Sequence, residues 1–267
     1  MRALLASPLG FLIGLSLGAL GGGGSILAVP ALVYAAGQSP KHATTTSLVL
    51  VGLTALIGIA PHWRAGRVRF VAGTIFGLAG IGGSLLGSHW NAAADPNVLL
   101  LAFAGLMLVA AYGMWRRARS APQPVGRSVG AAAATVVMPR PIDAGMVLKV
   151  VVAGSVVGFL TGFFGVGGGF VIVPGLVLAL GFTMPEAIGT SLLVIAINSA
   201  VALSTRLRPG LIEWGTVIPF TVASLLGVII GSRLASTRDS SSLQRWFVAL
   251  LVIVAGYTAV HSGLALR

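Results

Sequence analysis

Two glycine-rich stretches hold the backbone groups with which this chain can bind a ligand. The first is a glycine run at 21–24 followed by Ser25, and the second is Gly165 with a glycine run at 167–169. A helix that begins at Ser25 or Gly169 directs unpaired N–H groups and the positive end of its dipole toward the break, which favours an oxyanion. Glycine lets a ligand approach the backbone closely. The ligand-binding residues predicted at the breaks are Gly22, Gly23, Gly24, Ser25, Gly167, Gly168 and Gly169.

Neutral hydrogen-bonding side chains follow each break. Ser47 and Thr54 are seven residues apart and lie on nearly one face of a helix, and Ser191 and Asn198 repeat that spacing. Their O–H and N–H groups can hold an oxyanion without a fixed countercharge. Small and hydroxyl residues also allow close packing of membrane helices, so packing stays open as an alternative at the breaks and at these side chains. The side chains predicted to bind are Thr46, Ser47, Thr54, Thr190, Ser191 and Asn198.

Few charged side chains can take part. Arg64 and Arg208 stand beside loop glycines, where they can guide an anion or anchor the chain at the membrane interface. His42 and His62 lie near the ends of apolar segments, which favours interfacial positions over proton handling. All five carboxylates lie at segment ends, so none is assigned as a central proton relay.

No catalytic or cofactor-binding pattern accompanies these residues. The chain has no cysteine, its histidines have no evident Ser or Asp partners, and the glycine runs lack the lysine of a phosphate-binding loop. We therefore expect a protein without enzymatic activity, metal or cofactor.

The elements that position these residues are expected to be membrane-spanning helices. Mean hydropathy is +1.00, and 8% of the residues are charged, where a soluble domain has about a quarter. Charged residues leave eight apolar intervals, of which six fit a helix of about 20 residues and two, 3–40 and 150–185, are too long for one. The net charge of +12 comes mostly from basic residues between these intervals, where they act as topology signals, so nucleic-acid binding is not expected.

The chain contains an internal sequence repeat. A shift of 144 positions superposes the two halves without a gap, so that the glycines at 10, 14, 18, 21, 23 and 24 fall on those at 154, 158, 162, 165, 167 and 168. The expected division is a first membrane repeat at 1–119, a Pro-rich cytoplasmic linker at 120–145 and a second membrane repeat at 146–267.

Each repeat is expected to hold one glycine-broken helical hairpin and three transmembrane helices, which makes the fold an all-α polytopic membrane protein. An unbroken helix over 8–36 would extend about 43 Å, beyond a hydrocarbon core of about 30 Å. If the broken segment returns to the side from which it entered, the repeats are inverted; if it crosses, they are parallel. The basic residues satisfy the positive-inside rule in both cases. The inverted arrangement is favoured because it recurs in transporters with discontinuous helices. As a consequence, both termini would lie outside the cytoplasm.

Paired motifs in the two halves resemble a known family. "GALGGGGSILAVPALV" and "GFFGVGGGFVIVPGLV" are followed by "ATTTSL" and "AIGTSL", and then by "RAGRV" and "RPGLI". In this order and duplication they are similar to the TauE/SafE-type sulfite exporter family of membrane permeases. The resemblance implies a secondary transporter, usually an exporter, that moves sulfite, an organosulfonate or a related small sulfur-containing anion by alternating access across the bacterial inner membrane.

Several alternatives stay open at this stage. The first half has Thr45 where the second has Gly189, and Gly22 where the second has Val166, so the halves need not contribute equally. An anion channel, or a permease for an unrelated small solute, would use the same helix breaks, whereas a membrane enzyme or a non-transporting scaffold would bind no small anion there. Proton coupling and assembly as a homodimer are also left open.

Overall fold

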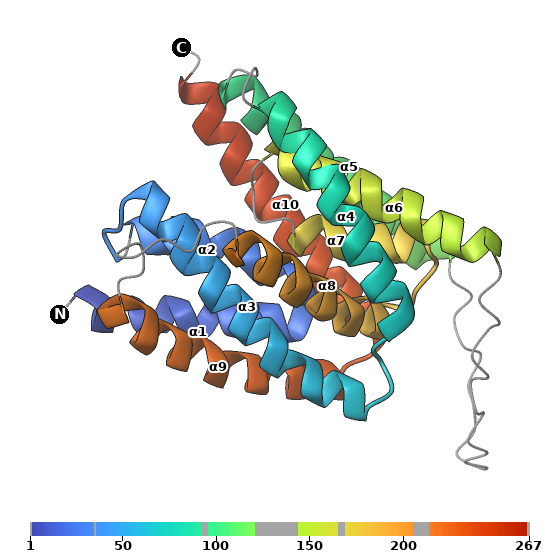
Figure 1. Ribbon diagram of the computed structural model, residues 1–267, viewed down its shortest axis with the longest axis horizontal. Helices are drawn as coiled ribbons and strands as arrows, with labels where there is room; N and C mark the ends of the chain where they lie inside the picture. The colour runs from blue at the N-terminus through green and yellow to red at the C-terminus, as the bar shows by residue number, and fades with distance from the viewer. Residues whose placement is uncertain are drawn as a thin grey trace.

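The computed structural model describes residues 2–34, 36–91, 96–120, 144–164, 169–204 and 214–265, and every regular element in these ranges is helical (Figure 1). The first half contains α1 (Arg2–Leu20), the 3-10 turn η1 (Gly21–Gly24), α2 (Ser25–Tyr34), α3 (Pro40–Arg64), α4 (Phe70–Asn91) and α5 (Pro96–Ser120). The second half contains α6 (Ala144–Phe164), α7 (Gly169–Pro174), the π-helical turn η2 (Gly175–Ala179), α8 (Met184–Ser204), α9 (Trp214–Thr237) and α10 (Ser240–Ala265). The predicted linker falls largely outside the described residues.

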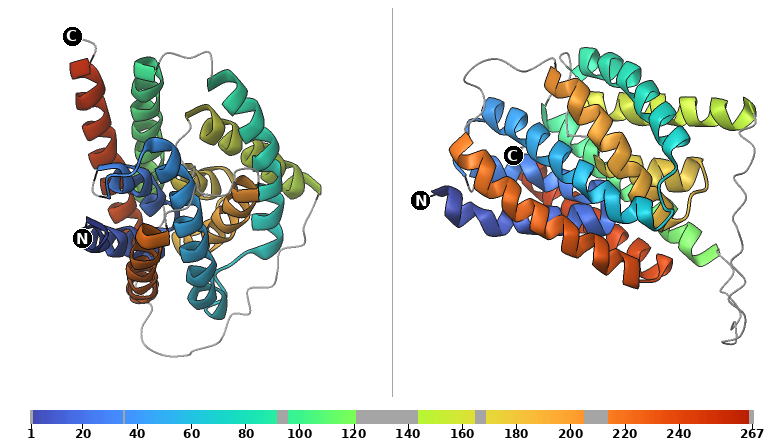
Figure 2. Two further views of the ribbon diagram at one scale, coloured as in Figure 1. Left: turned by 60° about the vertical axis from the view of Figure 1, so that its left-hand side comes forward. Right: turned by 60° about the horizontal axis from the view of Figure 1, so that its bottom comes forward.

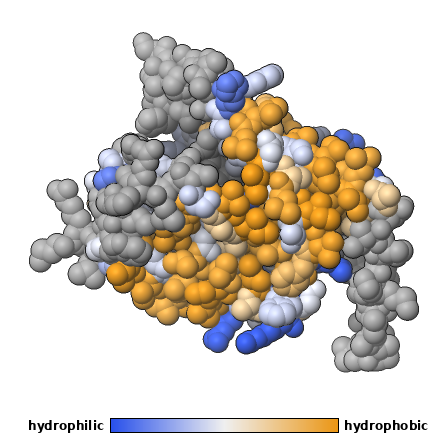
Figure 3. All heavy atoms as spheres, in the orientation of Figure 1, coloured by the Kyte–Doolittle hydropathy of each residue, from blue (hydrophilic) through white to orange (hydrophobic). Residues whose placement is uncertain are grey.

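The helices form a membrane protein, as predicted. Seven segments of the described chain are long and apolar enough to cross a bilayer, namely Pro8–Val33, His42–Arg64, Phe70–Trp90, Ala144–Phe164, Met184–Ser204, Val217–Thr237 and Ser240–Ala259. Figure 3 shows one face, where apolar residues cover the middle and hydrophilic residues lie toward the margins. Leu56, Leu85 and Val109 are each more than half exposed, which suits helices that face lipid tails.

The first glycine run reverses the chain. Gly21 has a φ of 70°, the left-handed conformation with which helices commonly end, and α1 stops one residue earlier. A Cβ atom built on Gly24 would lie 2.5 Å from the carbonyl oxygen of Ile13 and 2.7 Å from the backbone nitrogen of Leu17. Residue 24 therefore lies beside the preceding turns of α1, whereas a continuous helix would carry it well beyond them. The prediction of a break at Gly21–Gly24 is confirmed.

Glycine contacts also give the directions of two neighbouring helices. Along α1, Gly10, Gly14 and Gly18 lie against Phe220, Ser224 and Val228 of α9 in the same order, so α1 and α9 run parallel. The close packing needs glycine, since a Cβ on Gly14 would overlap the carbonyl oxygen of Ser224.

The same arrangement recurs between α4 and α6. Gly154, Gly158 and Gly162 of α6 lie against Phe76, Gly80 and Ser84 of α4, again in the same order. These two pairs are the most extensive helix contacts among the described residues, and each joins a helix of one half to a helix of the other. Figures 1 and 2 show α1 beside α9 and α4 beside α6.

The third helix of each half crosses its counterpart in the opposite direction. Gly52 of α3 lies against Ser199 of α8, whereas Gly58, further along α3, lies against the earlier residue Leu192. By contrast, α3 runs parallel to α9, because Thr54 faces Ser224 and, further along both helices, Gly58 faces Val228. Both α1 and α3 thus run parallel to α9, so the segment between them must return toward the start of α1.

Candidate functional site

The two helix breaks meet inside the protein. A Cβ atom on Gly22 would overlap the carbonyl oxygen of Gly169, and a Cβ on Gly169 would overlap the hydroxyl of Ser25. As predicted, α2 begins at Ser25 and α7 begins at Gly169. The hydroxyl of Ser25 donates a hydrogen bond of 2.7 Å to the carbonyl oxygen of Gly22. The structure therefore brings Gly22, Ser25 and Gly169 into direct contact.

Ser191 joins this group from α8. Its hydroxyl occupies the place where a Cβ on Gly21 would lie, and it donates a hydrogen bond of 2.8 Å to the carbonyl oxygen of Ile188. At Gly23 the added Cβ would meet the Leu250 side chain at 2.7 Å. Protein atoms therefore fill the space beside each of the four glycines of the first run. Close packing accounts for these glycines in this conformation, and ligand binding at them stays a prediction.

Thr54 forms a buried hydroxyl pair. Its Oγ1 donates to the carbonyl oxygen of Leu50 at 2.6 Å and lies 3.1 Å from the Oγ of Ser224 on α9. Sequence reasoning did not select Ser224, because its equivalent in the first half is Gly80, which offers no hydroxyl. The only signal for Ser224 is that it faces the buried hydroxyl of Thr54. Recognising this requires knowing that α3 and α9 pack together in three dimensions.

Asn198, which is equivalent to Thr54, has no comparable partner. Its Oδ1 atom is buried and has no hydrogen bond. The helix that corresponds to α9 is α4, where Gly80 replaces the serine that holds Thr54. An unpaired buried amide oxygen is costly. This asymmetry leaves Asn198 with an unsatisfied hydrogen-bonding group at the crossing of α3 and α8.

The remaining predicted donors are buried but differ in their bonding. Thr46 is fully buried and its Oγ1 has no partner, whereas Ser47 donates to the carbonyl oxygen of Thr44 at 2.8 Å. Thr190 is also fully buried, and its Oγ1 accepts a hydrogen bond of 3.1 Å from the backbone N–H of Arg69. An anion at Ser47, Thr54 or Ser191 would therefore compete with a backbone carbonyl for the hydroxyl proton.

An ion pair that sequence reasoning missed closes one end of this region. The guanidinium of Arg69 donates to Oε1 of Glu186 through Nε at 3.1 Å and through Nη2 at 2.5 Å. The other carboxylate oxygen accepts from the N–H and the hydroxyl of Thr183, which closes the first turn of α8. The pair joins the α3–α4 connection to α8, and no local pattern relates these segments.

His62 lies just inside that ion pair. Its side chain is 2% exposed and is therefore covered by protein, whereas its position relative to the membrane interface stays a prediction. The Nε2 atom lies 3.3 Å from the carbonyl oxygen of Gly18, and Nδ1 is buried without a partner. The burial arises because the α3–α4 connection covers the end of α3. A Cβ on Gly189 of α8 would lie 2.8 Å from the carbonyl oxygen of Arg67 in that connection.

Other predicted residues lie elsewhere. Arg64 is exposed at the end of α3, where both guidance of an anion and interfacial anchoring remain open. Gly167, Gly168 and Arg208 lie outside the described residues. Within the described ranges, no group of three or more His, Asp or Glu residues comes together as a metal site.

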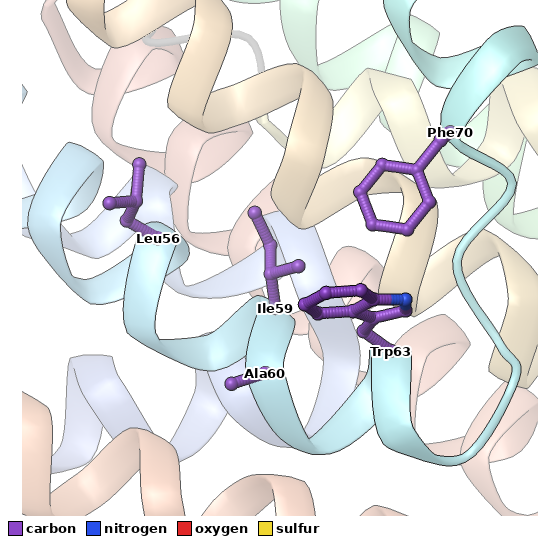
Figure 4. A pocket seen from close by; sticks show the side chains of 5 residues that line it. All are labelled: Leu56, Ile59, Ala60, Trp63 and Phe70. Atoms are coloured by element: carbon purple, nitrogen blue, oxygen red, sulfur yellow. The ribbon is translucent and has the colours of Figure 1, made fainter.

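A groove on the surface does not suit an anion. It has a volume of about 550 Å³ and is lined by Leu56, Ile59, Ala60, Trp63 and Phe70 (Figure 4). The rings of Trp63 and Phe70 meet edge to face with centroids 5.7 Å apart. Four of the five lining residues are aliphatic or phenyl side chains without any hydrogen-bond donor, and Trp63 has only its indole N–H.

The sequence of the whole membrane region matches a family of known type. The family model described as sulfite exporter TauE/SafE matches residues 6–258. The chain belongs to the TauE/SafE family. Its paired breaks, found at the centre of the fold, lie within the region that the family match covers.

Curated relatives of this TauE/SafE protein carry transporter names. A "Probable membrane transporter protein" of Xylella fastidiosa strain 9a5c is 35% identical over 257 residues, covering 95% of this chain and 93% of the relative. "Probable membrane transporter protein YunE" of Bacillus subtilis is 23% identical, and the match covers 98% of this chain and 96% of the relative. A third relative, "Probable membrane transporter protein y4hK" of Sinorhizobium fredii, is 26% identical, and the match covers 92% of this chain and 93% of the relative. No solved structure matches the chain.

Proposed function

We propose that this protein is a secondary transporter, in the direction of export, for sulfite, an organosulfonate or a related small sulfur-containing anion. Membership of the TauE/SafE family over residues 6–258 carries the proposal, and it alone supplies the sulfur. The meeting of two helix breaks, surrounded by hydroxyl and amide side chains, supports binding of a small oxyanion between α2, α7 and α8. In this proposal the anion crosses the membrane chemically unchanged, so no residue is assigned a catalytic role.

The proposal includes two inverted repeats. It is supported by the antiparallel crossing of α3 and α8, which are equivalent under the shift of 144 positions. It is further supported by the return of the chain at Gly24 in the first half and by the contact of Gly175 with Val157 of α6 in the second, which favour an odd number of crossings in each half. In this arrangement the linker at 120–145 lies in the cytoplasm and both termini lie outside. The bacterial relatives named above are consistent with a position in the bacterial inner membrane.

Alternating access would move helix groups that combine the two halves. Because glycine contacts bind α1 to α9 and α4 to α6, these pairs should each move as one body. We assign α1, α2, α3 and α9 to one body, and α4, α6, α7 and α8 to the other. The crossing of α3 and α8, which carries Thr54 and Asn198, is then the surface along which they slide.

The Arg69–Glu186 ion pair would close the cytoplasmic entrance in this conformation. Arg69 lies in the connection between α3 of one body and α4 of the other, and the pair fastens this connection to the start of α8, where it covers Gly189 and Thr190. Both side chains are partly exposed, at 37% and 22%, so the pair can separate without leaving a deeply buried charge. Opening of this end would break a contact of modest strength, as a reversible gate requires.

A counterflow experiment tests the function directly. Purified protein in liposomes loaded with unlabelled sulfite should accumulate labelled sulfite transiently, and sulfate, sulfoacetate and acetate should be compared as competitors. Saturable exchange without electrical current would distinguish a carrier from an anion channel. Transport of a cation or a neutral solute, with none of the sulfur anions, would refute the assignment.

A further inference from the structure

One buried titratable side chain has no role in the site described so far. His62 lies on α3 between the Arg69–Glu186 pair and the first helix break. On one side, Nε2 is 3.3 Å from the carbonyl oxygen of Gly18, three residues before Gly21. On the other side, its Cβ lies 3.1 Å from where a Cβ on Gly189 would be, two residues before Ser191. The imidazole is thus next to both segments that meet at the break.

The hydrogen bonding of His62 fixes which nitrogen carries the proton. A carbonyl oxygen only accepts, so Nε2 must be the N–H that donates to Gly18. In the neutral ring Nδ1 then holds a lone pair, and this atom is buried with no partner among the described residues. A buried nitrogen without a partner is an unfilled acceptor for a proton.

The charged groups around His62 leave that acceptor unoccupied. At the end of α3, Arg64 is exposed. In the connection that follows, Arg67 donates its backbone N–H to the carbonyl oxygen of His62 at 2.9 Å, and its positive charge adds no acceptor for Nδ1. Arg69 is engaged by Glu186, which is the charged residue of α8.

The helices packed against α3 add no further carboxylate. Helix α1 has only Arg2, at its opposite end, and α2 has no charged residue. Helix α9 has Arg233, which is exposed next to Ser232, the residue beside Gly18. Among the described neighbours, none offers a negative charge that is free to hold a protonated imidazole in place.

We propose that Nδ1 of His62 binds the proton that moves together with the transported anion, an inference that rests on the proposed function. An O–H bond of the protonated anion, or of a hydronium ion from the entrance, breaks as the Nδ1–H bond forms, and the electron pair stays on oxygen. The imidazole becomes a cation beside Gly18 and Gly189, on the two segments that carry Gly21 and Ser191, and there it strengthens binding of the anion. Because the coupling between two binding sites is reciprocal, the bound anion favours protonation of His62 to the same extent. Movement of the anion and movement of the proton are thereby coupled. On release, the proton leaves Nδ1 and the neutral ring returns.

The test uses liposomes that contain the full chain and a trapped pH-sensitive dye, with the membrane potential clamped by potassium and valinomycin. Inward sulfite gradients should produce both sulfite uptake and internal acidification above the level of protein-free liposomes. His62→Gln can still donate its amide to Gly18 but cannot take up a proton. We expect this variant to lose the protein-dependent proton signal and to exchange sulfite with a weaker apparent affinity, because the cation that strengthens anion binding cannot form. The matched control is His89→Gln, at an exposed histidine of α4, which should behave as the unchanged protein.

The outcomes separate this inference from the proposed function. If His62→Gln moves as many protons per sulfite as the unchanged protein, or if the unchanged protein moves sulfite without protons, proton binding at His62 is refuted and the transport function stands. If the unchanged protein moves no sulfur anion, the function itself fails. Should His62→Gln not fold, nitrogen NMR of labelled histidine in the unchanged protein decides instead, since sulfite should shift one buried imidazole toward its protonated form. No such shift would overturn the inference.

Discussion

The glycine contacts between the two halves can be tested with single methyl groups. In Gly14→Ala the new Cβ would overlap the carbonyl oxygen of Ser224, and in the equivalent variant Gly158→Ala it would overlap that of Gly80. Both obstacles are helix backbone, which cannot rotate away as a flexible side chain can. The helices of each pair must therefore separate, which costs about 3 kcal/mol, at the upper end of the usual range for overpacking.

Part of this cost is offset by the helix propensity of alanine, which is about 1 kcal/mol better than that of glycine. The net loss is about 2 kcal/mol, which lowers the melting temperature of a chain of this size by about 4–8 °C. The assay is thermal unfolding of the purified protein in detergent. Gly82→Ala is the control, because a Cβ there meets nothing within 4 Å, and it should leave stability unchanged or slightly higher. If Gly14→Ala and Gly158→Ala melt at the same temperature as Gly82→Ala, the close cross-half packing is wrong.

Two further predictions concern the gate and the topology. A double-mutant cycle of Arg69→Gln and Glu186→Gln should give a coupling energy of about 1 kcal/mol in thermal unfolding at low salt and less at high salt, because both groups are partly exposed; a coupling of zero would remove the proposed gate contact. A reporter fused after Arg267 should lie outside the cytoplasm while one inserted at Arg127 lies inside, and finding both in the cytoplasm would replace the inverted arrangement with a parallel one.

The helix breaks were predictable because backbone chemistry determines them. A glycine run inside an apolar segment too long for one span can only be a turn or a kink, and Ser25 is the first residue after the run that favours a helix. The start of α2 at Ser25 follows from this reasoning, and α7 begins at Gly169, within the second glycine run, as predicted. The backbone conformation at these positions depends on residues adjacent in the sequence, and these can be identified from the sequence of one chain alone.

The contacts of the site were not predictable to the same degree. The partners of Thr54 and Glu186 lie 170 and 117 positions away, and helical periodicity does not say which helix faces a given side chain. Burial of His62 likewise depends on how the connection after it folds over α8. The role of the predicted side chains in ligand binding stays a prediction, since in this conformation several of their protons are donated to backbone carbonyls.

The pairing of α1 with α9 has a consequence for the order of assembly during synthesis. Gly14 meets Ser224, which is translated 210 residues later, or about 10–40 s at typical rates of 5–20 residues per second. Gly80 and Gly158 are 78 positions apart, so α4 and α6 can associate much earlier. Helix α1 must therefore wait, with its glycine face toward lipid, until α9 has been made. A ribosome that stalls before α9 would leave that face unpaired and exposed to membrane quality control.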